Sequence, residues 1–142
     1  MSIFGRRGIA IVLLSVCLTS CATISRHMFV EPTNAWRARS GQLLYRNAKT
    51  TLTGEVLVRF SKNGDFELTF SKGPGITVLV LRQNTRFAEL KGPLAGRGWS
   101  GPIDRAPQQL HGWLDLRDKL IGAPHQQSIR YSMRAEEFLF QF

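Results

Sequence analysis

Apolar and polar residues alternate along two neighbouring stretches of the chain, and this pattern predicts a β-hairpin. In residues 52–60 every second position is apolar or glycine, so one face of an extended strand would point toward a core. Residues 65–71 alternate in the same way, with Phe, Leu and Phe on one face. Asn63-Gly64 lies between them, and both residues accept the positive φ that a tight hairpin turn needs.

Five other stretches are predicted as strands. They are residues 42–46, 76–83, 86–90, 128–133 and 137–142. Residues 76–83 are apolar on both faces, so we expect this strand to be covered on both sides. Residues 91–102 are rich in Gly and Pro, which is typical of a loop.

Residues 110–121 carry the pattern of an amphipathic helix. Its apolar face consists of Leu110, Trp113, Leu114, Leu116, Leu120 and Ile121. Gly122 and Pro124 follow, and these residue types commonly end a helix. Together the elements predict an α+β fold, in which a curved antiparallel sheet of about seven strands forms an open half-barrel with one lid helix.

The N-terminal residues have the pattern of a bacterial lipoprotein signal. Arg6 and Arg7 precede an apolar run over residues 8–18, which has the length of a secretory h-region. The run is shorter than the roughly 20 residues that span a bilayer. It leads into Leu-Thr-Ser-Cys, which resembles the lipobox, the signal whose cysteine receives diacylglycerol before the chain is cut in front of it. We therefore expect Cys21 to become a lipidated N-terminus that anchors the protein to a membrane.

These features divide the chain into three parts. Residues 1–20 are the expected signal peptide, 21–40 the lipidated N-terminus and tether, and 41–142 a single β-rich domain. Ala22 follows the cysteine, and a residue other than Asp there resembles the sorting signal for the outer membrane. We expect the periplasmic face of the outer membrane, with the periplasmic face of the inner membrane as the alternative.

The remaining residues favour a protein that is not an enzyme and has no metal or cofactor. Cys17 lies in the run that is expected to be removed, so no thiol is left for a disulfide, a metal or a nucleophile. The three histidines lack metal-ligand spacing, and Gly98–Pro102 lacks the last glycine of a nucleophile elbow. The formal net charge is +9, but the basic residues are scattered and the secretion signal argues against nucleic acid. Attraction to anionic lipid is a secondary expectation.

One apolar face of the predicted sheet is a candidate ligand site. A helix of about 12 residues is roughly 18 Å long, too short to cover seven strands, so the sheet either curls on itself or leaves an apolar trough open. In a lipid-anchored protein such a trough is a candidate site for acyl chains. The predicted wall residues are Phe66, Leu68, Phe70, Val78, Val80 and, on the helix, Trp113. The alternative is that this face is a packed core.

Two segments resemble the LolB family of outer-membrane lipoprotein receptors. Residues 66–81, FELTFSKGPGITVLVL, are similar to the family's aromatic-led strand, its short Pro-Gly loop, here Pro74-Gly75, and its second apolar strand. Residues 110–114, LHGWL, are similar to its lid helix. The resemblance implies a half-closed barrel whose hydrophobic cavity takes acyl chains of lipids or lipoproteins from a periplasmic carrier protein. It thereby implies a role in lipoprotein or lipid localisation.

The chain departs from that family in two respects. Pro74 stands where the family presents an exposed leucine that is used in delivering cargo to the membrane, so this step is not carried over. After the predicted helix the chain has room for about two strands, whereas the family continues with several. A second hypothesis therefore stays open, in which the sheet is a non-enzymatic binding module for a protein partner in the envelope.

Overall fold

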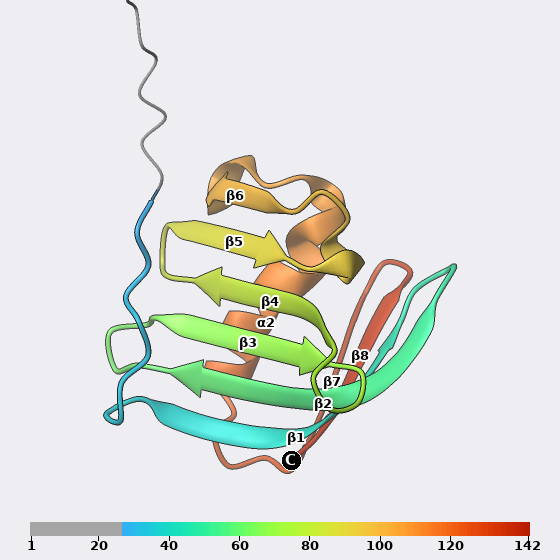
Figure 1. The fold of residues 1–142 in the computed structure, drawn as a ribbon, viewed down its shortest axis with the longest axis horizontal. Helices are drawn as coiled ribbons and strands as arrows, with labels where there is room; N and C mark the ends of the chain where they lie inside the picture. The colour runs from blue at the N-terminus through green and yellow to red at the C-terminus, as the bar shows by residue number, and fades with distance from the viewer. Residues whose placement is uncertain (1–26) are drawn as a thin grey trace, which may run out of the picture.

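The computed structural model describes residues 27–142, which form one antiparallel sheet with a helix against it (Figure 1). The strands are β1 (Arg37–Arg46), β2 (Thr51–Phe60), β3 (Phe66–Ser71), β4 (Thr77–Gln83), β5 (Phe87–Lys91), β6 (Trp99–Pro102), β7 (Ser128–Met133) and β8 (Glu136–Gln141). The helix is α2 (His111–Ile121), and the 3-10 turns are η1 (Pro93–Ala95), η2 (Ile103–Arg105) and η3 (Gln108–Leu110). The predicted signal peptide and Cys21 lie outside the described residues.

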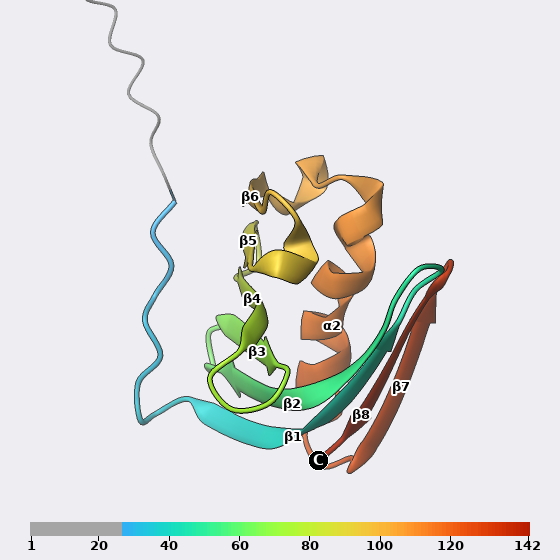
Figure 2. The same cartoon turned by 45° about the vertical axis from the view of Figure 1, so that its right-hand side comes forward.

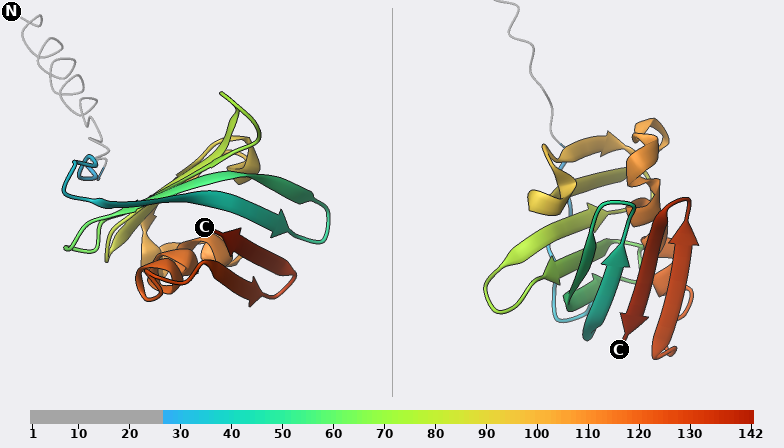
Figure 3. Two further views of the ribbon diagram at one scale, coloured as in Figure 1. Left: turned by 90° about the horizontal axis from the view of Figure 1, so that it is seen from below. Right: turned by 90° about the vertical axis from the view of Figure 1, so that its right-hand side faces the viewer.

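The strands follow the order β6-β5-β4-β3-β2-β1-β8-β7 across the sheet. The chain builds β1 to β6 as a meander, passes through α2, and returns with β7 and β8 to the edge of β1. The sheet curves strongly, so that β7 and β8 turn toward the side where α2 lies (Figures 2 and 3). Within residues 27–142 the sheet ends at β6 and β7 and does not close. The predicted α+β fold with an open half-barrel is confirmed.

Two glycines lie where the strand backbones approach most closely. A Cβ atom on Gly41 of β1 would overlap the carbonyl oxygen of Gln141, and one on Gly54 of β2 would overlap that of Ser71. Glycine within a strand commonly marks a tight bend or a close approach of another backbone. These two residues therefore permit the sharp curvature of β1 and β2 that Figure 2 shows.

A single core fills the concave side between the sheet and α2. Its largest fully buried side chains include Phe66, Phe70, Phe138 and Phe140 from the sheet and Leu116 and Leu120 from the helix. Trp113 of α2 packs edge-to-face on Phe138, with ring centroids 4.9 Å apart. Burial of this apolar surface is the main force that holds the helix on the sheet.

The face of β4 that points to the core differs from the prediction. Leu79 and Leu81 lie opposite Phe70 and Leu68 on the core face, where Val78 and Val80 had been expected. Val80 lies opposite Thr69 on the outer face and is half-buried. The register shifts by one residue next to Phe70, and such a shift exchanges the two faces of a strand. Because the sequence of β4 is apolar on both faces, alternation could not decide between them.

Two boundaries also differ from the prediction. β6 lies within the stretch expected to be a loop, and it pairs with β5 through Leu90 and Trp99. Glycine and proline are tolerated in a short edge strand because its outer backbone groups need no partner strand. β1 begins at Arg37, inside the expected tether, and this residue already pairs with Phe60 of β2.

Residues 27–36, here called the strap, cross the outer face of the sheet on the side away from α2 (Figure 1). His27 stacks on Phe87 of β5 with ring centroids 4.2 Å apart, and its Nε2 atom lies 2.9 Å from Nδ2 of Asn84. Part of the segment predicted as a tether is therefore packed on the domain.

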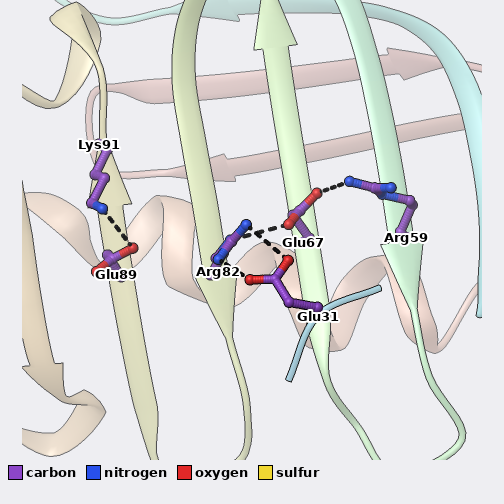
Figure 4. A network of polar contacts seen from close by, with 6 residues as sticks. All are labelled: Glu31, Arg59, Glu67, Arg82, Glu89 and Lys91. Atoms are coloured by element: carbon purple, nitrogen blue, oxygen red, sulfur yellow. Dashed lines mark hydrogen bonds and ion pairs between the residues drawn. The ribbon is translucent and has the colours of Figure 1, made fainter. Parts of the chain in front are cut away.

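An ion-pair network connects the middle of the strap to the sheet (Figure 4). Glu31 of the strap accepts a hydrogen bond of 3.1 Å from Nη1 of Arg82. The Nε atom of Arg82 donates to Glu67 of β3 at 3.1 Å, and Arg59 of β2 also binds Glu67. Glu67 is only 4% exposed, and a buried carboxylate requires such partners.

Candidate ligand-binding site

A cavity of about 800 Å³ opens at one end of the concave side. Four segments that are distant in sequence surround it: the β1–β2 turn, the η1 loop up to Trp99, η3 with Leu110, and the β7–β8 turn. In Figure 2 the two hairpin tips rise on one side of this space, and the turns before α2 lie on the other. The volume falls within the range of about 300–1,000 Å³ that small-molecule sites occupy.

The floor of the cavity is apolar. It is lined by Leu79, Leu90, Leu94, Ala95, Trp99, Leu110 and Trp113. Three of these side chains, Leu79, Leu90 and Trp113, are at most 3% exposed and belong to the core as well. The other four are partly buried and pack against that core. The cavity is thus an extension of the core that no described side chain fills.

The rim of the cavity is polar and mainly basic. Lys49, Arg97 and Arg134 line it, and all three are exposed. They come from the β1–β2 turn, the loop before β6 and the β7–β8 turn, so they approach the mouth from different sides. Arg134 has a positive φ of 53° and donates a hydrogen bond of 3.0 Å to Oε1 of Gln108.

One carboxylate, Glu136, also lines the cavity. Its Oε2 atom accepts a hydrogen bond of 2.6 Å from the hydroxyl of Tyr45, which in turn accepts one of 3.1 Å from Nδ2 of Asn47. Burial, and then the hydrogen bond to Glu136, raise the pKa of Tyr45 to about 12. Tyr45 is therefore neutral at physiological pH and acts as a fixed donor to this carboxylate.

The structure brings only one of the predicted wall residues to the cavity. Trp113 lines it, whereas Phe66, Leu68 and Phe70 are at most 2% exposed and lie in the packed core outside its lining. Val78 is buried beside the register shift, and Val80 faces the other side of the sheet.

Sequence reasoning missed most of the lining. The predicted wall included Val78 and Val80 but not Leu79, and Leu94 and Trp99 lie in the stretch that was predicted as a loop. The one available signal was the segment LHGWL, residues 110–114, which supplies both Leu110 and Trp113. Nothing local in the sequence shows that the basic rim residues meet at one mouth.

The Pro74-Gly75 loop connects β3 and β4 at the same end of the sheet as the cavity mouth (Figure 1). Gly73 and Gly75 have φ values of 73° and 76°, which only glycine adopts without strain. The amide of Lys72 donates a hydrogen bond of 2.8 Å to the carbonyl oxygen of Ile76 and closes the loop. Ile76 is 59% exposed, so this loop presents an apolar side chain to solvent.

Residues 27–142 lack two further features. This part of the chain has no cluster of three or more His, Cys, Asp or Glu side chains that could hold a metal ion. It also has no helix long and apolar enough to cross a membrane.

Comparison with known proteins gave no assignment. No family model matches the chain, and no curated protein matches it either.

Proposed function

We propose that this protein is an envelope lipoprotein that binds acyl chains in the cavity at the open end of its half-barrel. The observation that carries the proposal is the cavity of about 800 Å³ with its floor of Leu, Ala and Trp side chains. An apolar ligand gains about 25 cal/mol for each Å² of surface that it buries on such a floor. The resemblance to the LolB family agrees with this function, and it implies transfer of lipids or lipoproteins from a periplasmic carrier protein.

The place of action follows from the expected anchor. Lipidation of Cys21 would hold the domain at the periplasmic face of the outer membrane, with the inner membrane as the alternative. A ligand with acyl chains is abundant at either surface. Binding of such a ligand is non-covalent, so we expect the function to involve no enzyme activity, cofactor or metal.

The experiment uses the chain from residue 21 onward with Cys21→Ser, so that no lipid is attached. Binding of a fluorescent fatty acid is measured for this protein and for Leu94→Gln. Leu94 lines the cavity and is only partly buried, so the new amide can stay hydrated while it repels an acyl chain. We expect affinity to fall about tenfold, or 1.4 kcal/mol, with little change in melting temperature.

Two control variants separate the cavity from the rest of the sheet. Val80→Gln places the same amide on the half-buried outer face, and it should leave binding unchanged. Leu68→Gln places it in the core, where Leu68 is fully buried, and it should lower stability by about 1–3 kcal/mol. Absence of fatty-acid binding in the parent protein would refute the proposal.

Recognition of a protein partner is the second candidate function, because β6 and β7 are free edges of the sheet within residues 27–142. Strand addition at such an edge is a common mode of peptide recognition. However, β6 has four residues and ends in Pro102, and β7 carries the exposed Arg130 in its middle. Short strands, proline and charge are features that protect edges from pairing, so the cavity is the better-supported site.

A further inference from the structure

The cavity described above combines an apolar floor with a charged mouth. Lys49, Arg97 and Arg134 are exposed at the rim, and Glu136 is the one carboxylate in the lining. The lining therefore carries a formal charge of +2. The apolar floor can bind an acyl chain, but an acyl chain has no polar group that could pair with the cations of the rim.

We propose that the ligand is an amphiphile with an anionic head group, a carboxylate or a phosphate, which the basic rim binds while the chain lies on the floor. This inference rests on the proposed function, because it specifies the head of the acyl ligand. Guanidinium and ammonium groups form short, charge-assisted hydrogen bonds with carboxylate and phosphate oxygens.

The rim cations are available for such a head group. Among residues 27–142 none of the three lies within 4 Å of a carboxylate, whereas Arg46, Arg82 and Lys91 each pair with a glutamate. Arg134 has one neutral partner, Gln108, through Nη1. The rim thus has donors that no described acidic group occupies.

The single carboxylate of the lining does not neutralise the rim. Glu136 accepts a hydrogen bond from Tyr45 and lies at the base of the β7–β8 turn, on the core side of the cavity. An amphiphile whose acyl chain enters first would lie along the apolar floor, and its head group would remain among the exposed cations of the rim. Three positive groups around one mouth also raise the local concentration of anionic ligands.

The backbone places Arg134 in the two-residue loop of the β7–β8 hairpin, between the paired Met133 and Glu136. Tight hairpin loops commonly need a positive φ, although residues other than Gly, Asn or Asp seldom supply it. Among residues 27–142 Arg134 is the one residue other than glycine with a positive φ. At the tip of the β7–β8 turn this conformation places a long cationic side chain at the mouth.

The test compares ligands that share one chain and differ in the head. Dodecanoate, dodecyl phosphate and dodecanol compete with a bound fluorescent fatty acid on the chain from residue 21 with Cys21→Ser. We expect both anionic ligands to bind at least about tenfold more tightly than dodecanol, and we expect added salt to reduce this difference. The two anionic ligands, compared with each other, show whether the site prefers a carboxylate or a phosphate.

A matched pair of double variants shows whether the rim causes the preference. Lys49→Gln with Arg97→Gln removes two charges from the rim, and it should reduce the preference for anionic heads about tenfold while dodecanol binds as before. Arg37→Gln with Lys62→Gln removes two exposed charges at the opposite end of the sheet and should change neither.

The two proposals fail in distinguishable ways. If dodecanol binds as tightly as dodecanoate, or if the control variant loses the preference as much as the rim variant, the anionic-head inference is overturned and the proposed function stands. If none of the three ligands displaces the probe, the proposed function itself fails.

Discussion

At the residue scale, the contact between Tyr45 and Glu136 connects the core to the cavity. Tyr45 is 3% exposed and packs against Trp113 with ring centroids 4.8 Å apart, while its hydroxyl binds the carboxylate of the lining. A buried hydroxyl that lacked this acceptor would cost about 1–3 kcal/mol. The Tyr45 hydroxyl and the Glu136 carboxylate therefore satisfy each other's hydrogen bonding beside the apolar floor.

This contact predicts a pH dependence of stability. Unfolded Tyr45 ionises near its ordinary pKa of 10.0, but burial and Glu136 raise its pKa to about 12 in the fold. The stabilisation is fully present below pH 10 and is lost as the pH rises toward 12, because the unfolded state releases its proton first. In chemical denaturation, Tyr45→Phe should therefore lose less stability over this interval than the wild type does.

Tyr131 provides the control for this measurement. Its pKa is also raised to about 12, by burial and by the hydrogen bond that it donates to Asp115. The Tyr45→Phe variant should therefore keep part of the decrease in unfolding free energy between pH 10 and 12. The protein has two tyrosines, and Tyr45→Phe with Tyr131→Phe should remove the tyrosine contribution completely. Equal slopes for the wild type and the double variant would contradict this account.

At the scale of the elements, the bend in β1 and β2 decides the shape of the sheet. Gly41 lies opposite Val56, and Gly54 lies opposite Leu43, so the two glycines are close to each other at the same bend. Beyond this bend the two strands turn toward α2 and their hairpin tip reaches the cavity mouth (Figure 2).

Substitution of these glycines should open the bend. Gly54→Ala places a methyl group against the carbonyl oxygen of Ser71, which is backbone and cannot rotate away. We expect the free energy of unfolding to fall by about 1–3 kcal/mol, as for other overpacked sites, and fatty-acid binding to weaken as the hairpin tip moves. Glu55→Ala changes an exposed neighbour in the same strand and should have little effect on either. Unchanged stability of Gly54→Ala would show that the sheet curves for another reason.

At the scale of the whole molecule, the strap and the cavity lie at opposite ends of the sheet. His27, where the described chain begins, contacts Asn84 and Phe87 at the β4–β5 turn. The cavity mouth lies among the β1–β2 and β7–β8 turns, at the other end of the strands (Figure 1). Between these two ends, Glu31 of the strap pairs with Arg82, which also pairs with Glu67 of β3.

The expected anchor can be tested on the chain of residues 1–142. If Cys21 carries the lipid, Cys21→Ser should abolish metabolic labelling with a fatty acid and release the protein from the membrane fraction. One acyl chain alone holds a protein only marginally, whereas a diacylglycerol gives stable attachment. Cys17→Ser is the matched control, because it changes the other cysteine and should leave labelling intact. Labelling that persists in Cys21→Ser would rule out this anchor.

The sequence by itself determined the elements whose pattern is local. Alternation and the Asn63-Gly64 turn predicted the β2–β3 hairpin, and the helical spacing of Leu and Trp predicted α2 to within one residue of its observed start. These signals suffice because each depends on neighbouring residues and on burial of a single face. The curved, open sheet with one helix also followed, since a short helix cannot cover so many strands.

Only the tertiary structure decided which residues form the site. The core face of β4 depends on a one-residue register shift against β3. Because β4 is apolar on both faces, its sequence does not indicate this shift. β6 contains Gly and Pro and forms a strand because it pairs with the edge of β5. The cavity unites four turns that are separated by up to about 90 positions in sequence, and its basic rim arises from their meeting in space. Local residue patterns therefore determine helices and strands. A cavity depends on how distant elements pack against each other, because it is the space that their side chains leave unfilled.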